Sequence, residues 1–118
     1  MRDAEKIPAN LEPYVTALGV ADAERFFLAL GGSDIYLPAK SSPRSMAART
    51  IGADRVEKLA AELGPGYIKV PLARKWVART MMARGESYAE IARTVRADVA
   101  TVRRWLGPRD THHQPELF

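Results

Sequence analysis

Residues 98–106 combine two adjacent arginines with small and apolar side chains. An arginine can donate two parallel hydrogen bonds to a guanine, or it can hold a phosphate group. Both roles stay open for Arg103 and Arg104, whereas Val99 or Ala100 can press against a thymine methyl group. If this segment is a helix lying in a DNA groove, its outward residues are Val99, Ala100, Thr101, Arg103 and Arg104.

The sequence around these residues predicts a helix-turn-helix over residues 88–106. In the first helix, Ile91, Ala92 and Val95 form an apolar face, and the small Ala92 allows two helices to cross closely. Asp98 is expected to begin the second helix, because its carboxylate can accept hydrogen bonds from the free amides of the first turn. Such a pair of helices has the geometry that enters a major groove. An ordinary helical hairpin with a solvated basic face is the alternative.

The inward side of the second helix is expected to carry Val102, Trp105 and Leu106, which recur at i, i+3 and i+4. Gly107 and Pro108 then end the helix. We expect Trp105 to lie in the core rather than to stack on a base, so its replacement by alanine should unfold the motif.

The net charge of +4 is distributed unevenly along the chain. Residues 1–60 hold eight basic and eight acidic side chains, whereas residues 61–118 hold ten and six. A positive field around the helix-turn-helix is what neutralisation of phosphates requires. Plain solvated charge is the alternative for each of the expected phosphate contacts. These are Lys75, Arg79, Arg84, Arg93 and Arg96.

Arg96 stands in the predicted turn, where many such motifs carry glycine. Either this arginine adopts a left-handed backbone, or the turn is built differently.

Other classes of function find little support in the composition. No apolar stretch is long enough to span a membrane, and the charged first ten residues do not suit a secretory signal. The absence of cysteine excludes disulfides and thiolate metal sites, and is compatible with a cytoplasmic protein. His112, His113 and Glu116 are a weak candidate metal site, and we expect none. No catalytic set or glycine-rich phosphate loop is evident, so we expect neither an enzyme, a cofactor nor a small-molecule substrate.

The chain is expected to be mostly α-helical, with two short β-strands that can pair with each other and a C-terminal helix-turn-helix. We divide it into an N-terminal arm (1–13), a helical and short-strand region of dimerisation type (14–71), the helix-turn-helix region (72–107) and a tail (108–118). Asp54 is expected to cap a helix that runs to Leu63. A longer helix is expected from Leu72 to Arg84.

The region 14–71 contains an internal repeat. Matching residues of its two copies are always separated by the same number of positions, as Leu30 and Leu63 are. Each copy has a helix, a glycine break, a short strand and a proline that ends the strand. The matching residues are Leu30, Gly31, Ile35, Leu37 and Pro38 in the first copy and Leu63, Gly64, Ile68, Val70 and Pro71 in the second. Two like units around a twofold axis present their strands in opposite directions. We therefore expect residues 35–37 and 68–70 to pair as antiparallel strands, within one chain or between subunits.

The segment Leu30-Gly-Gly-Ser-Asp-Ile-Tyr-Leu-Pro38, followed by a C-terminal helix-turn-helix, resembles the Mor family of phage transcription activators. The resemblance covers Phe26 to Leu106. It implies a homodimer built on the N-terminal helices, with strands from two subunits pairing near the dyad and contacting DNA. It also implies contact with RNA polymerase at sites just upstream of a promoter.

This chain departs from the family pattern in one respect. A second helix-strand unit, Asp54 to Pro71, stands between the family-like strand and the helix-turn-helix. One chain can therefore supply both strands that two subunits supply in the family. Because a twofold operator needs two recognition helices, we still expect a dimer on DNA.

Two exposed features outside the helix-turn-helix have an open role. Lys69 and Tyr36 occupy equivalent strand positions and face away from their apolar neighbours. Lys69 can reach a minor-groove phosphate, but a solvated strand face is favoured. The tail Gln114-Pro-Glu-Leu-Phe118 resembles the short peptide with which bacterial proteins dock on the DNA sliding clamp. We favour the alternative that Leu117 and Phe118 pack on the domain or on a partner subunit.

The sequence as a whole favours a sequence-specific DNA-binding transcription regulator of phage or prophage type, with activation favoured over repression. The alternatives are a repressor, a DNA-recognition subunit of another phage process, and a protein–protein adaptor that docks through its tail. The expected partners are double-stranded DNA, a second copy of the chain and RNA polymerase.

Overall fold

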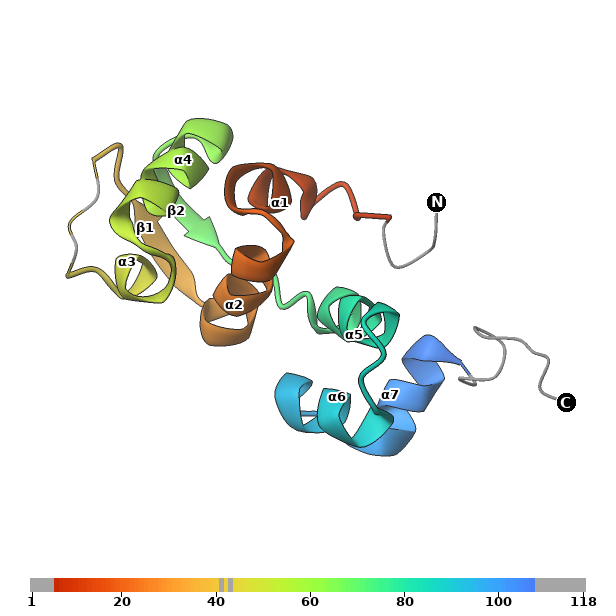
Figure 1. The fold of residues 1–118 in the computed structure, drawn as a ribbon. Helices are drawn as coiled ribbons and strands as arrows, with labels where there is room; N and C mark the ends of the chain where they lie inside the picture. Colours follow the sequence, from red (N-terminus) through yellow and green to blue (C-terminus); the bar gives the residue numbers. More distant parts are fainter. Residues whose placement is uncertain (1–5, 41, 43, 108–118) are drawn as a thin grey trace, which may run out of the picture. The chain divides into compact units, whose positions relative to one another are not determined.

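The computed structural model describes residues 6–40, 42 and 44–107 (Figure 1). In this part of the chain there are seven helices and one sheet of two antiparallel strands, which confirms the expected mostly α fold. The residues form two compact units, and we describe each by itself. The repeat unit is Ile7–Ala73, and the helix-turn-helix unit is considered over residues 74–107. Of the helices described, none has both the length and the apolar character needed to cross a bilayer.

The repeat unit consists of two copies of the same element order. The first copy is α1 (Glu12–Leu18), α2 (Val20–Leu30) and β1 (Asp34–Leu37). The second copy is α3 (Met46–Ile51), α4 (Ala53–Leu63) and β2 (Gly66–Lys69). Helices α2 and α4 begin and end at equivalent positions of the two copies, which confirms the offset found in the sequence. The repeat therefore extends further upstream than the sequence comparison indicated.

A glycine separates the two helices in each copy. Gly19 and Gly52 are related by the same offset, and both have a positive φ, of 82° and 93°. Residues other than glycine rarely adopt this backbone conformation. The same change of chain direction thus joins α1 to α2 and α3 to α4, and a glycine makes it in both copies.

The two strands pair with each other within one chain. Their antiparallel register brings Ile35 opposite Ile68, and Tyr36 opposite Tyr67. Ile35 and Ile68 are equivalent positions of the repeat, so the register is itself symmetric about this pair. This confirms the antiparallel pairing, and it answers whether one chain can supply both strands.

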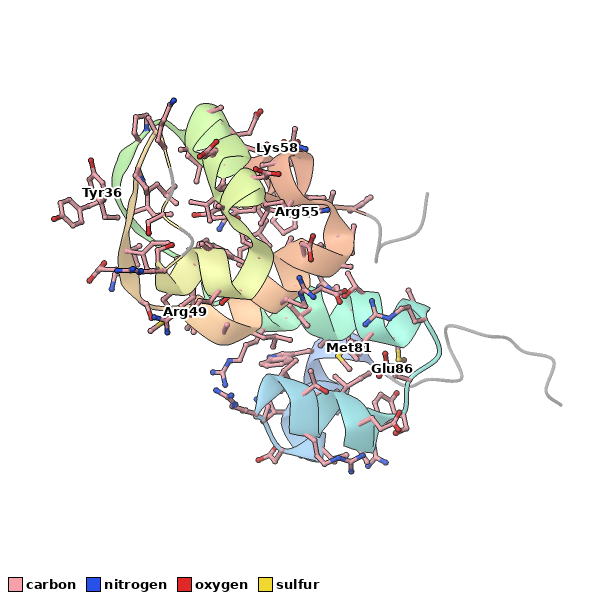
Figure 2. The ribbon with its side chains drawn as sticks, turned by 60° about the vertical axis from the view of Figure 1, so that its left-hand side comes forward. Tyr36, Arg49, Arg55, Lys58, Met81 and Glu86 are labelled. Carbon is pink, nitrogen blue, oxygen red and sulfur yellow. The ribbon has the colours of Figure 1, made fainter. Side chains whose placement is uncertain are left out.

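The helices of the repeat unit pack in a reciprocal way around the strands. Helix α1 contacts α4, and α2 contacts α3, as a pseudo-twofold relation between the copies requires. Alternate strand residues point to opposite faces of the sheet. Leu37 and Val70 are fully buried, whereas Tyr36 and Tyr67 are exposed on the other face. Figure 2 shows Tyr36 pointing away from the helices.

The core of the repeat unit is unequal between the copies. Tyr14, Phe26 and Phe27 form an aromatic cluster, with ring centroids 5.1 to 6.3 Å apart. At the positions equivalent to the two phenylalanines, the second copy carries the smaller Leu59 and Ala60, and all of these residues are buried. The first copy thus supplies most of the bulk. Large side chains of the first copy and small ones of the second can together fill a shared core, in which both voids and excess volume would be destabilising.

Three helix boundaries differ from the sequence-based expectation. Helix α1 already begins at Glu12, inside the expected arm, because a proline in the first turn needs no hydrogen-bond partner for its nitrogen. Helix α4 begins at Ala53 directly after Gly52, so Asp54 lies within the first turn and does not cap it. The helix expected from Leu72 to Arg84 is shorter, and α5 covers Arg74–Ala83.

Candidate nucleic-acid interface

The helix-turn-helix unit contains α5 (Arg74–Ala83), α6 (Tyr88–Val95) and α7 (Val99–Leu106). Helices α6 and α7 are the two predicted helices, and α5 packs against both of them. The interior that they share is apolar, and residues from all three helices fill it. Its buried apolar side chains are Trp76, Val77, Ala78, Met81, Met82, Ile91, Ala92, Val95, Val102 and Leu106, and the polar Thr80 is buried beside them.

Polar side chains begin both helices of the motif. The Ser87 hydroxyl accepts a hydrogen bond from the Glu90 amide at 3.1 Å, and the Asp98 carboxylate accepts one from the Thr101 amide at 2.7 Å. Asp98 therefore caps α7 as predicted. The hydrogen bonds from Thr101, followed by the nearby Arg104, lower the pKa of the Asp98 carboxyl group. The start of α7 thus carries a negative charge at neutral pH.

The turn between α6 and α7 is built on Arg96 in the left-handed conformation. Its φ and ψ are 61° and 49°, which answers whether an arginine is tolerated where many turns carry glycine. The amides of Arg96 and Ala97 both reach the Ala92 carbonyl, a hydrogen-bond pattern that ends a helix. This conformation costs a residue with a side chain about 1–2 kcal/mol.

Arg74 holds the C-terminal end of α6, a role that the sequence analysis missed. Its guanidinium donates to the carbonyl oxygens of Val95 and Arg96, at 3.4 and 3.2 Å. A cation at this end of a helix also favours the helix dipole. Arg74 is thus engaged in the fold of the motif, although the charge count alone makes it a candidate DNA contact.

The five residues expected to face a base pair all lie at least partly on the surface of α7. Ala100, Arg103 and Arg104 are exposed, and Val99 and Thr101 are half-buried. This placement agrees with the outward face predicted from the sequence.

The inward face of α7 differs from the expectation at one position. Val102 and Leu106 are buried as predicted, but Trp105 is only half-buried. The fully buried tryptophan of the unit is instead Trp76 on α5. Trp105 therefore lies at the edge of the core rather than fully inside it, as is common for so large a side chain.

The adjacent arginines of α7 differ in their surroundings. Arg103 lies over the ring of Tyr88, with its guanidinium carbon 5.2 Å from the ring centroid. The Tyr88 hydroxyl donates to the Gly107 carbonyl at 2.7 Å, so the same ring ties the start of α6 to the end of α7. Arg104 instead approaches the Thr101 hydroxyl at 3.5 Å, one turn nearer the N-terminus of α7. Tyr88 was missed as a functional residue, and its signal is its place directly after the capping Ser87, inside the pattern Ser87-x-x-Glu90.

The expected phosphate contacts are not equivalent either. Lys75, Arg93 and Arg96 are exposed. Arg84 forms an ion pair with Glu86 at 3.3 Å, which makes Arg84 a weaker candidate for a phosphate contact. Arg79 is half-buried on α5.

Lys69 belongs to the repeat unit rather than to the helix-turn-helix unit. It is exposed on β2, and its ammonium lies 3.8 Å from the Asp34 carboxylate of β1. A DNA contact through Lys69 stays a prediction. Leu117, Phe118 and the histidines of the tail lie outside the described residues.

The two units differ sharply in charge. Residues 74–107 hold eight basic and three acidic side chains, whereas residues 7–73 hold seven of each. The positive excess of these two ranges therefore belongs entirely to the helix-turn-helix unit, where it suits phosphate binding.

Comparison of the chain with protein-family models, with curated proteins and with solved structures gives no match. The functional argument therefore rests on the geometry and charge of the helix-turn-helix unit.

Proposed function

We propose that this chain binds double-stranded DNA in a sequence-specific manner, with α7 as the recognition helix in the major groove. The observation that carries the proposal is the α6–α7 pair itself. A capped second helix follows a tight left-handed turn, and its outer face carries two exposed arginines. A helix of this kind presents its N-terminal part to the base edges.

Within this proposal the outer residues have separate roles. Arg104 lies on the same face as Thr101 and one turn from the helix start, so it reads a base edge, with guanine as its best partner. Arg103 is held on Tyr88 and contacts a phosphate. The exposed Lys75, Arg93 and Arg96 contribute further phosphate contacts that orient the unit on the duplex.

The biological role that we propose is transcription regulation of phage or prophage type. The resemblance of Leu30–Pro38 to the Mor family supports activation through RNA polymerase over repression. A reporter gene behind the bound promoter separates the two, because an activator raises its expression and a repressor lowers it.

The DNA-binding proposal is tested by a gel shift with the region upstream of the protein's own gene. We expect a discrete shifted band that an excess of unrelated duplex does not remove. R104A should bind the specific duplex more weakly and narrow the difference between the two duplexes. A wild-type protein that shifts neither duplex at low salt would contradict the proposal.

A further inference from the structure

Equivalent positions of the two copies contact one another in the repeat unit. The midpoint between any two equivalent positions lies on the pseudo-twofold axis, so pairs that touch lie next to that axis. Ile35 and Ile68 form one such pair, directly opposite each other in the sheet. Asp22 and Arg55 form a second, because they occupy equivalent positions of α2 and α4.

The Asp22–Arg55 pair shows which copies of the repeat pair with each other. The Arg55 Nε atom lies 2.6 Å from the Asp22 Oδ2 atom, while Arg25 holds the other carboxylate oxygen, also at 2.6 Å. Two identical halves facing each other would bring together two aspartates or two arginines at this place. Like charges at such a distance repel, whereas the observed pair attracts. The first half is therefore complementary to the second half and not to itself.

The twofold repeat unit carries one recognition helix and not two. After β2, the chain passes into α5 and the helix-turn-helix unit. After β1, only residues 38–44 precede Ser45, which caps α3. This connection is too short to contain a helix-turn-helix. The symmetry of the repeat unit thus stops at its strands.

We propose that a single chain is the complete DNA-binding unit and that its target is one non-palindromic segment of duplex. Dimeric helix-turn-helix proteins read two half-sites because their twofold axis relates two recognition helices. Here the twofold pairing is satisfied inside one chain that has one such helix. Helix α7 has 8 residues, so it spans about 12 Å, the length of roughly four base pairs. This inference rests on the proposed function, and it replaces the dimer expected from the sequence.

Selection of bound sites from a random duplex library tests the inference together with the mass of the complex. We expect a short consensus without inverted symmetry and a complex with one 13.0 kDa chain per duplex. A palindromic consensus with two chains, spaced by about ten base pairs, would overturn the single-chain inference and leave DNA binding intact. Failure to enrich any sequence would instead overturn the proposed function, and the inference with it.

Charge exchange at the axis tests the pairing independently of DNA. D22R places two arginines at the axis and R55D places two aspartates there, and each should lower the melting temperature by about 4–8 °C. The double variant D22R/R55D restores the axial pair in one chain and should recover part of this loss, since Arg25 still lacks its partner Asp22. If the halves instead pair between two chains, an equimolar refolded mixture of D22R and R55D would recover it. Recovery in the mixture, or a D22R chain as stable as wild type, would overturn the inference.

Discussion

The repeat unit and the helix-turn-helix unit use their charged side chains in opposite ways. In the repeat unit the charges balance, and the aspartates at its axis and on its sheet are paired with basic residues. In the helix-turn-helix unit basic residues are in excess, and Lys75, Arg93 and Arg104 stay exposed. A protein gains little stability from unpaired surface charge, but such charge attracts a polyanion. The charges of the first unit are thus used within its own fold, whereas the exposed basic residues of the second can serve the DNA binding that we propose.

The largest effect that we predict concerns the core of the helix-turn-helix unit. W76A removes a buried indole and should lower the free energy of unfolding by about 3–5 kcal/mol. W105A removes a half-buried indole and should cost clearly less. Urea denaturation followed by circular dichroism measures both. Equal losses would return Trp105 to the core and shift the outward face of α7.

The next effect concerns the two arginines of the recognition helix. R104A should weaken binding to the selected site by about 1–3 kcal/mol and relax the preference at one base pair. R103A should weaken binding to every DNA sequence by about the same factor, because we assign Arg103 to a phosphate contact that carries no sequence information. Fluorescence anisotropy with the selected site and its single-base variants separates the two outcomes. A loss of preference in R103A but not in R104A would reverse the assigned roles.

A smaller effect separates stability from binding at the turn. R96G relieves the left-handed backbone of Arg96 and should stabilise the protein by about 1 kcal/mol. The same change removes an exposed positive charge and should weaken DNA binding. R96K is the matched control, since it keeps both the charge and the strain. If R96G raised stability and left affinity unchanged, Arg96 would not be a phosphate contact.

The smallest effect is the response of the α7 cap to acid. Because the pKa of Asp98 is lower in the folded protein, its ionised form stabilises the fold at pH values above the usual aspartate value near 3.9. This contribution should disappear as the pH falls below 4 and through the folded-state pKa. D98N keeps a capping oxygen but does not titrate, so it should flatten this part of the pH profile. Thermal melts between pH 3 and 6 compare the two proteins, and parallel curves would contradict the role of the carboxylate.

Local signals in the sequence were sufficient for much of this structure. The constant offset between the two copies predicted two paired antiparallel strands, and the position of Asp98 predicted the start of α7. Both depend on residues that are close in sequence or repeated at a fixed distance. The repeat and the capped helix could therefore be predicted from the sequence.

The parts that could not be predicted depend on contacts between distant residues. No periodicity shows that Arg74 reaches the end of α6, or that Tyr88 holds Arg103 across the motif. The burial of Trp105 also depends on how much surface α5 and α6 can cover, which a helical pattern does not contain. The constant offset makes Asp22 and Arg55 equivalent, but their contact depends on how the two copies pack together.

The salt dependence of DNA binding tests the central contrast most directly. With about five phosphate contacts, the slope of log K against log salt should be about −4 to −5 for the wild-type chain. R93Q, in the helix-turn-helix unit, should reduce the magnitude of this slope by about 1, whereas R49Q, on an exposed site of α3, should leave it unchanged. A flat wild-type slope, or equal changes in the two variants, would contradict the assignment of DNA binding to the basic helix-turn-helix unit.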